Sequence, residues 1–142
     1  MKTLIIGLGN AILKDEGVGI RVVDEISKLI GTHESVKVIK TSWAGLNLLD
    51  FFYGYERVVI IDSVRNYKGF DGEMHKLIVE ELTNARLNSF ASGVDLKTTL
   101  ELGKNLGRYI PRKIDIYAVE IKAGVIYEEG LSSRIEKKLP EY

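Results

Sequence analysis

The 142-residue sequence contains no cysteine, two histidines and two prolines, and this scarcity excludes several kinds of chemistry. Without cysteine the chain has no disulfide, no thiolate zinc site, no iron–sulfur cluster and no cysteine nucleophile. Two histidines are too few for a three-histidine metal site and leave few arrangements for a Ser/His/Asp triad. Metal binding or acid–base catalysis must therefore depend mainly on carboxylates.

The sequence also lacks an excess of charge of one sign and a long hydrophobic run. Its 20 basic residues balance 20 acidic ones, so the basic excess typical of nucleic-acid-binding proteins is missing. No apolar run approaches the roughly 20 residues needed to cross a bilayer. Glycines interrupt the apolar stretch 3–13, charges follow it, and it has no small-x-small cleavage site. We therefore expect a buried strand and turn there instead of a signal peptide, in a cytoplasmic protein that binds neither nucleic acid nor membrane.

The pattern of apolar residues predicts the fold class. No repeat, low-complexity tract or linker is present, so we expect one domain over residues 1–142. The segments with the pattern of strands are 2–9, 35–39, 57–64, 73–79 and 113–121. The segments with helical spacing are 18–30, 43–52, 95–109 and 132–139. This alternation predicts an α/β fold of three layers (α/β/α), in which helices cover both faces of a mainly parallel, twisted sheet of about five strands.

The densest motif is the glycine-rich stretch from Gly7 to Gly19, which joins the first strand to the first helix. A dinucleotide-binding G-x-G-x-x-G fingerprint is excluded because Ile12 occupies its last glycine position, and the pattern of a phosphate-binding loop is missing too. Asp15 and Glu16 precede the helix, where one carboxylate is enough to cap it and complement its dipole. The second carboxylate is surplus, and it lies where glycines allow backbone to approach a ligand.

Asp62 is the second informative carboxylate, because it follows the apolar strand residues 58–61. Open α/β sheets bind their ligands at the carboxyl ends of the strands. If the strand order is 2-1-3, Glu16 and Asp62 flank one crevice, where two carboxylates suit a divalent metal or an acid–base pair. The alternative is that Asp62 only caps the following loop through its own backbone.

Three segments resemble the nickel–iron hydrogenase maturation endopeptidases, and the similarity extends over nearly the whole chain. They are the turn 7–10 (GLGN), the helix start 15–19 (DEGVG) and the strand 58–64 (VVIIDSV). The resemblance implies an endopeptidase that removes the C-terminal extension of a nickel-loaded hydrogenase large-subunit precursor. It also implies that nickel arrives with the substrate, so the enzyme has no permanent cofactor, although other divalent metals can occupy the site.

The resemblance further implies roles for individual residues. Glu16 and Asp62 correspond to the two acidic nickel ligands and are the candidate catalytic residues. Gly9, Asn10 and Ser92 are candidates for contact with the substrate.

Other positions depart from the family's pattern. The family usually has a histidine as third metal ligand where this sequence has Ser92, and commonly an aspartate where it has Lys40. Ser92 and Asp95 also form a Ser-x-x-Asp pattern close to a capping box. Asp95 is the better replacement ligand, although nickel favours nitrogen donors. Neither His33, expected in a turn, nor His75, expected in a strand where it faces solvent or pairs with a neighbour, substitutes by position.

Alternative functions stay open at this point. One is a non-catalytic homologue that acts as a metal- or precursor-binding assembly module, and the other is an unrelated α/β protein that binds a small molecule with the loop 7–19. The aromatic residues Trp43, Phe90, Tyr53 and Tyr55 either line a peptide groove or belong to the core and its rim.

Overall fold

The computed structural model describes residues 2–9, 18–30, 35–41, 45–65, 67, 69, 72–83, 87, 96–121 and 139–142. The strands are β1 (Thr3–Leu8), β2 (Val36–Thr41), β3 (Arg57–Arg65), β4 (Met74–Leu77) and β5 (Lys113–Ile121). The α-helices are α1 (Val18–Ile30) and α2 (Leu96–Asn105). Short 3₁₀ helices are η2 (Gly45–Phe51), η3 (Val79–Thr83) and η4 (Leu139–Glu141).

The strands form one five-stranded sheet in the order β2-β1-β3-β5-β4. β1 pairs in parallel with β2 and β3, β3 pairs in parallel with β5, and β4 pairs antiparallel to β5. In the chain, β1 is followed by β2, which lies toward one edge of the sheet, whereas β3 is followed by β4 and β5, which lie toward the other edge. The topological switch point therefore lies between β1 and β3. The expected mainly parallel sheet is confirmed, and the strand order meets the 2-1-3 condition set out above.

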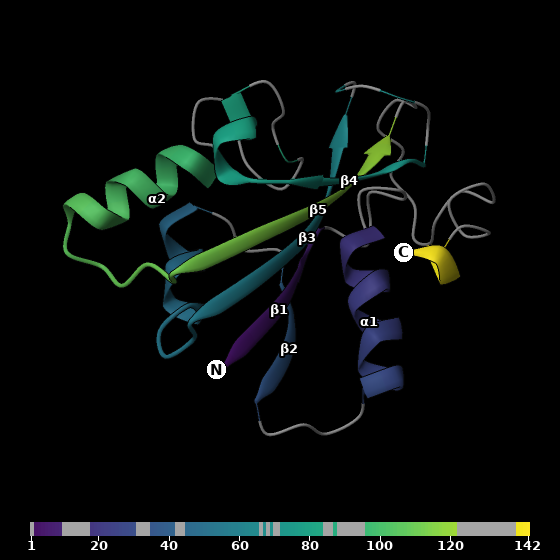
Figure 1. Cartoon of the computed structure of the whole chain (residues 1–142), viewed down its shortest axis with the longest axis horizontal. Helices are drawn as coiled ribbons and strands as arrows, with labels where there is room; N and C mark the ends of the chain where they lie inside the picture. Colours follow the sequence, from purple (N-terminus) through teal and green to yellow (C-terminus); the bar gives the residue numbers. More distant parts are fainter. Residues whose placement is uncertain are drawn as a thin grey trace.

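Helical elements cover both faces of the sheet, as the sequence predicted (Figure 1). α1 lies on one face and packs on β1, β2 and β3, whereas α2 contacts η2 and η3 on the other. The core on the α1 side includes Val18, Val22, Val23, Ile61, Val119 and Ile121. The core on the α2 side includes Leu4, Ile6, Leu48, Phe52, Ile60, Leu96 and Ile116. Because side chains alternate along a strand, successive residues of β3 face the two cores in turn.

Two glycines of the glycine-rich stretch allow α1 to approach the sheet closely. A Cβ atom on Gly7 would lie 2.5 Å from the carbonyl oxygen of Gly19 and from Cγ2 of Val23. A Cβ atom on Gly19 would lie 2.5 Å from the carbonyl oxygen of Ile61. Both distances are shorter than a real carbon contact, so only glycine fits. At these two positions the glycines serve the packing of the helix against β1 and β3.

Some element boundaries differ from the prediction for local reasons. The helix expected over 95–109 ends at Asn105, because Gly107 adopts φ 76° and closes it with a Schellman motif. In that motif Arg108 N–H donates to the Gly103 carbonyl at 2.8 Å and Gly107 N–H to the Lys104 carbonyl at 3.1 Å. The segment expected as a helix over 43–52 contains the 3₁₀ helix η2, and the strand expected over 73–79 is shortened to β4.

The predicted C-terminal helix 132–139 lies outside the described residues except for its last position, where Leu139 begins η4. In the part of the chain that the structure describes, no helix has both the length and the apolar character to cross a membrane.

Candidate functional site

Asp62 lies at the switch point between β1 and β3. The β1–β3 ladder ends with the pair Gly7–Ile61, so Asp62 is the first residue of β3 beyond β1. The strand continues past Asp62 to Arg65, one residue beyond the predicted range 57–64, because β5 still pairs with it. Asp62 is 0% exposed and takes the α2-side position of the alternating strand. The structure therefore places a buried carboxylate where open α/β sheets bind ligands.

The resolved contact of Asp62 is local. The backbone N–H of Ser63 donates a hydrogen bond to Oδ1 of Asp62 at 2.7 Å. This bond agrees with the capping alternative, in which the side chain of Asp62 accepts a hydrogen bond from the backbone that follows it. A carboxylate removed from water is costly unless it is hydrogen-bonded, paired or coordinated. Burial and the Ser63 bond thus hold Asp62 in a defined orientation at the carboxyl end of the β1–β3 pair.

The structure describes only part of the predicted site. Glu16, Asn10, Ser92 and Asp95 lie outside the described residues. Gly9 is described and buried, and its N–H donates to the carbonyl oxygen of Thr41 at 3.3 Å, at the carboxyl ends of β1 and β2. Within the described ranges, no group of three or more His, Cys, Asp or Glu residues is arranged to hold a metal ion.

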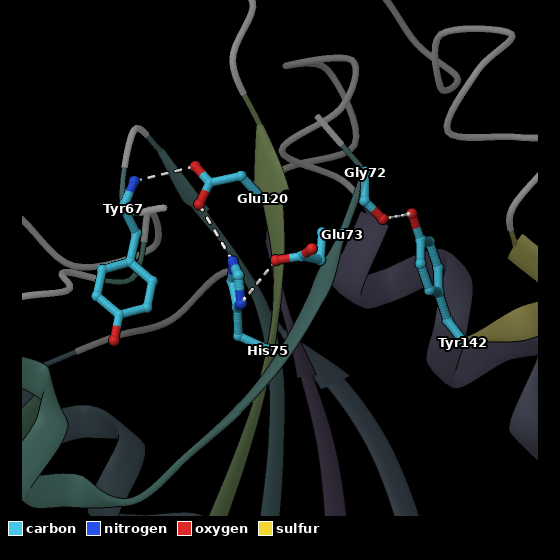
Figure 2. A network of polar contacts seen from close by, with 6 residues as sticks. All are labelled: Tyr67, Gly72, Glu73, His75, Glu120 and Tyr142. Carbon is cyan, nitrogen blue, oxygen red and sulfur yellow. Dashed lines mark hydrogen bonds and ion pairs between the residues drawn. The ribbon is translucent and has the colours of Figure 1, made fainter. Parts of the chain in front are cut away.

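A buried polar cluster lies on the same face as Asp62, and sequence reasoning missed it. Glu120 is fully buried, and its Oε1 lies 3.2 Å from Nε2 of His75 (Figure 2). On the other side of the imidazole, Oε2 of Glu73 lies 3.5 Å from Nδ1. His75 is 7% exposed, so the expectation that it pairs with a neighbour is confirmed and the solvent-facing alternative is wrong.

A signal for this cluster was present in the alternation of β5. Glu120 lies two residues beyond Ala118 and four beyond Ile116, both of which are buried on the α2 side. The period of two therefore assigns Glu120 to the inward face. The identity of its partner, 45 residues earlier in the chain, was not visible in that pattern.

Two of the four candidate aromatic residues, Tyr53 and Tyr55, lie in the part of the chain that the structure describes. Tyr53 is 80% exposed and its ring contacts that of Tyr109, with centroids 5.9 Å apart. The backbone carbonyl of Tyr55 accepts a hydrogen bond from the hydroxyl of Tyr109. Tyr53 and Tyr55 precede β3 and Tyr109 precedes β5, so these residues lie at the amino ends of the strands, opposite Asp62. Trp43 and Phe90 lie outside the described residues.

Lys40 also has a simple structural role. It lies within β2, and its Nζ donates to Oδ1 of Asp24 on α1 at 2.9 Å. Both side chains are partly exposed, so this is a surface ion pair between a strand and the helix that covers it.

Solved structures with the same architecture are hydrogenase maturation proteases. The hydrogenase maturating endopeptidase HybD of Escherichia coli superposes with a TM-score of 0.78 at 24% identity, covering 99% of this chain and 86% of that one. The [NiFe] hydrogenase maturation protease HybD of Thermococcus kodakarensis has a TM-score of 0.68 at 26% identity, covering 99% of this chain and 93% of that one. The fold is therefore shared over essentially the whole chain.

Sequence comparison gives shorter matches to proteins of the same kind. The hydrogenase 2 maturation protease of E. coli K12 is 29% identical over 82 residues, which cover 58% of this chain and 50% of that protein. The hydrogenase expression/formation protein HupD of Rhizobium leguminosarum is 29% identical over 63 residues, covering 44% of this chain and 31% of that protein. The matched segments thus span half or less of these curated relatives.

The family model described as HycI, hydrogenase maturation protease, matches residues 20–142, which is most of the sequence. A match of this extent removes the alternative of an unrelated small-molecule binder. The chain belongs to the hydrogenase maturation protease family.

Proposed function

We propose that the chain is an endopeptidase that removes the C-terminal extension of a nickel-loaded hydrogenase large-subunit precursor in the cytoplasm. The observation that carries this proposal is the buried carboxylate of Asp62 at the β1–β3 switch point of a protein in the hydrogenase maturation protease family. The nickel belongs to the precursor and is part of the substrate. The protein partner is the precursor itself.

Asp62 and Glu16 are the proposed catalytic pair and the acidic contacts of the nickel held by the substrate. Glu16 precedes Val18, the first residue of α1, by two positions, and Gly19 packs against the carbonyl of Ile61, next to Asp62. This packing supports the placement of Glu16 beside Asp62. Oxygen donors are suitable ligands for a divalent cation, and a carboxylate can also act as a general base.

The proposed reaction is hydrolysis of one peptide bond. The oxygen of water forms a bond to the scissile carbonyl carbon, the carbon–nitrogen bond breaks, and the leaving nitrogen receives a proton. A carboxylate that accepts a proton from water and later returns it to the nitrogen balances this sequence. Asp62, held in a fixed orientation away from bulk water, suits that role because a buried base interacts strongly with the reacting groups.

The remaining site residues are assigned by position. We propose that Gly9 and Asn10 contact the precursor beside the carboxyl end of β1, and that Ser92 contacts it from the segment before α2. Asp95, directly before Leu96 at the start of α2, is the proposed third oxygen ligand.

The test is incubation of the purified chain with nickel-loaded precursor, followed by mass spectrometry of the large subunit. We expect loss of the C-terminal extension with the wild-type chain, and no loss with Glu16→Ala or Asp62→Ala. Asp115→Asn is the control, because it alters a buried carboxylate at the other end of the sheet. If both alanine variants process the precursor at the wild-type rate, the proposed site is wrong.

A non-catalytic assembly module is the second candidate function. It is favoured by one observation, Ser92 at the position where the family's pattern has a histidine. This candidate predicts that the chain captures the nickel-loaded precursor without shortening it, and that Ser92→His restores cleavage. Capture with cleavage by the wild-type chain rules it out.

A further inference from the structure

Glu120 is a buried residue near the carboxyl end of β5, and each oxygen of its carboxylate contacts another residue. Its Oε1 lies 3.2 Å from Nε2 of His75, and its Oε2 accepts a hydrogen bond from the backbone N–H of Tyr67 at 3.0 Å (Figure 2). The rings of Tyr67 and His75 meet edge to face, with centroids 5.2 Å apart. Hydrogen bonds to a carboxylate are among the strongest in proteins, so Glu120 holds the Tyr67 amide firmly while its other oxygen contacts the His75 ring.

The backbone of Glu120 binds the same part of the chain. The N–H of Gly72 donates to the Glu120 carbonyl at 2.7 Å, and the N–H of Glu120 donates to the Glu73 carbonyl at 2.8 Å. Tyr67 lies two positions after β3, whereas Gly72 and Glu73 directly precede β4. One residue therefore holds the connection between β3 and β4 at both of its ends.

Further contacts tighten this arrangement around the connection. The hydroxyl of Tyr142 donates to the carbonyl of Gly72, so the last residue also reaches the connection. Gly69 has φ 79° and leaves room for the carboxylate of Glu73, which a Cβ atom on Gly69 would displace. Glu73 in turn faces Nδ1 of His75.

The strand register places this cluster beside Asp62. Ala118 of β5 pairs with Asp62 on one side and with His75 on the other. All three therefore lie in one row across the sheet, and the Cα atoms of Asp62 and His75 are separated by two strand spacings, or about 10 Å. Glu120 pairs with Val64, one step further along the same face.

The part of β3 that carries Asp62 leads into the connection that this cluster contacts. Beyond Ile61 the ladder with β1 ends, and the residues from Asp62 to Arg65 are paired with β5. These residues continue directly into the connection that Glu120 holds. Movement of the connection would therefore be transmitted to the orientation of Asp62.

We propose that Glu120 is a positioning residue for the Asp62 site, and that its carboxylate, with His75 and the Tyr67 amide, holds the end of β3 in the orientation that hydrolysis requires. This inference rests on the proposed function. Misplacement of a catalytic group by a fraction of an ångström slows the chemical step more than it weakens substrate binding. Loss of the clamp therefore lowers kcat with little change in KM.

The test compares Glu120→Gln with Asp115→Asn, which alters the other buried carboxylate of the same strand. For Glu120→Gln we expect kcat for precursor cleavage to fall at least about tenfold and KM to change less than about threefold. Asp115→Asn should leave both constants at wild-type values. A Glu120→Gln variant with normal kcat overturns the proposal.

A second measurement does not depend on cleavage. The amide of Ser63 donates to Asp62, so its NMR chemical shift reports the orientation of that carboxylate. We expect Glu120→Gln to change the Ser63 shift and to accelerate hydrogen exchange of the Tyr67 amide, whereas Asp115→Asn changes neither. If the wild-type chain cleaves no precursor, the proposed function fails, and an unchanged Ser63 shift separately overturns the positioning role.

His75→Leu provides a second variant if Glu120→Gln does not fold. It keeps the Tyr67 bond and removes the imidazole from Glu120, so we expect a smaller fall in kcat, about threefold or more. His75→Gln, which retains a donor toward Glu120, should restore most of that loss. Equal kcat values for His75→Leu and the wild type overturn the role of the imidazole in the clamp.

Discussion

The two ends of β5 each carry a buried carboxylate, and their partners differ. At the amino end, Oδ2 of Asp115 lies 3.0 Å from Nε and 2.9 Å from Nη2 of Arg57, a permanent cation at the partly exposed rim. At the carboxyl end, Glu120 is fully buried and binds an imidazole and the backbone amide of Tyr67. Asp115 thus joins two neighbouring strands, whereas Glu120 holds the chain that connects β3 to β4.

Under the proposed function, the Asp115 contact stabilises the sheet, whereas the Glu120 contacts position the Asp62 site. The ion pair between Asp115 and the partly exposed Arg57 joins β3 to β5 at the amino ends of these strands, opposite Asp62. At the carboxyl end, β3 continues beyond the last residue that pairs with β1, and Asp62 is the first residue of this extension. Side chains there must hold loops in place, because ligands of open α/β sheets are bound by the segments that leave these strand ends.

The largest effect is expected for Asp62→Asn. Asparagine keeps the shape and an oxygen that accepts the Ser63 N–H, but it can neither act as a base nor bind a cation as strongly. Precursor cleavage should fall by about 100-fold or more in single-turnover assays. The thermal midpoint should stay the same or rise, because a buried charge is removed. An equal loss of cleavage in Asp115→Asn would contradict the proposed difference between the two ends of β5.

Gly19→Ala tests the close packing that brings α1 to the crevice. The added methyl group would overlap the carbonyl of Ile61, so we expect a loss of about 1–3 kcal/mol in unfolding free energy and slower cleavage. Urea denaturation and the cleavage assay measure the two effects. Gly54→Ala is the control at the amino end: no atom lies within 4 Å of its Cβ position, and at φ 91° it should lose about 1 kcal/mol in stability without slower cleavage. Faster or unchanged cleavage in Gly19→Ala would contradict the link between packing and site.

Asp115→Asn should affect stability alone. It removes the charge that Arg57 pairs with, and because the guanidinium is partly exposed we expect a loss of about 1–2 kcal/mol. The free energy comes from urea denaturation, and kcat and KM from assays well below the thermal midpoint. A changed kcat in a fully folded sample would show that the amino end also contributes to the reaction.

Gly107→Ala should have the smallest effect. The residue closes α2 at φ 76° with open space around its Cβ position, so the cost is the left-handed conformation itself, about 1 kcal/mol. Thermal unfolding measures it, and cleavage should be unchanged because the position is remote from Asp62. Gly107→Asn is the matched variant, since asparagine tolerates this conformation better and should recover part of the loss. No difference between the two variants would contradict the conformational explanation.

Some elements were predictable because a repeating apolar pattern spans their full length. The helix predicted over 18–30 and the strand predicted over 113–121 coincide with α1 and β5. In each element the apolar pattern continues over the whole length. The end of α2 was misplaced because apolar residues continue past Asn105, while one glycine in a left-handed conformation ends the helix. Periodicity records which side of an element is buried, and it does not record where a capping motif interrupts it.

By itself the sequence determined the α/β class, the mainly parallel sheet and the place of Asp62 in the third strand. Each follows from local pattern and from the rules that connect parallel strands. Only the tertiary structure decided that His75 is buried against Glu120 and that Arg57 pairs with Asp115. The physical reason is that a period of two assigns a side chain to a face, whereas its partner depends on the register between strands distant in the chain.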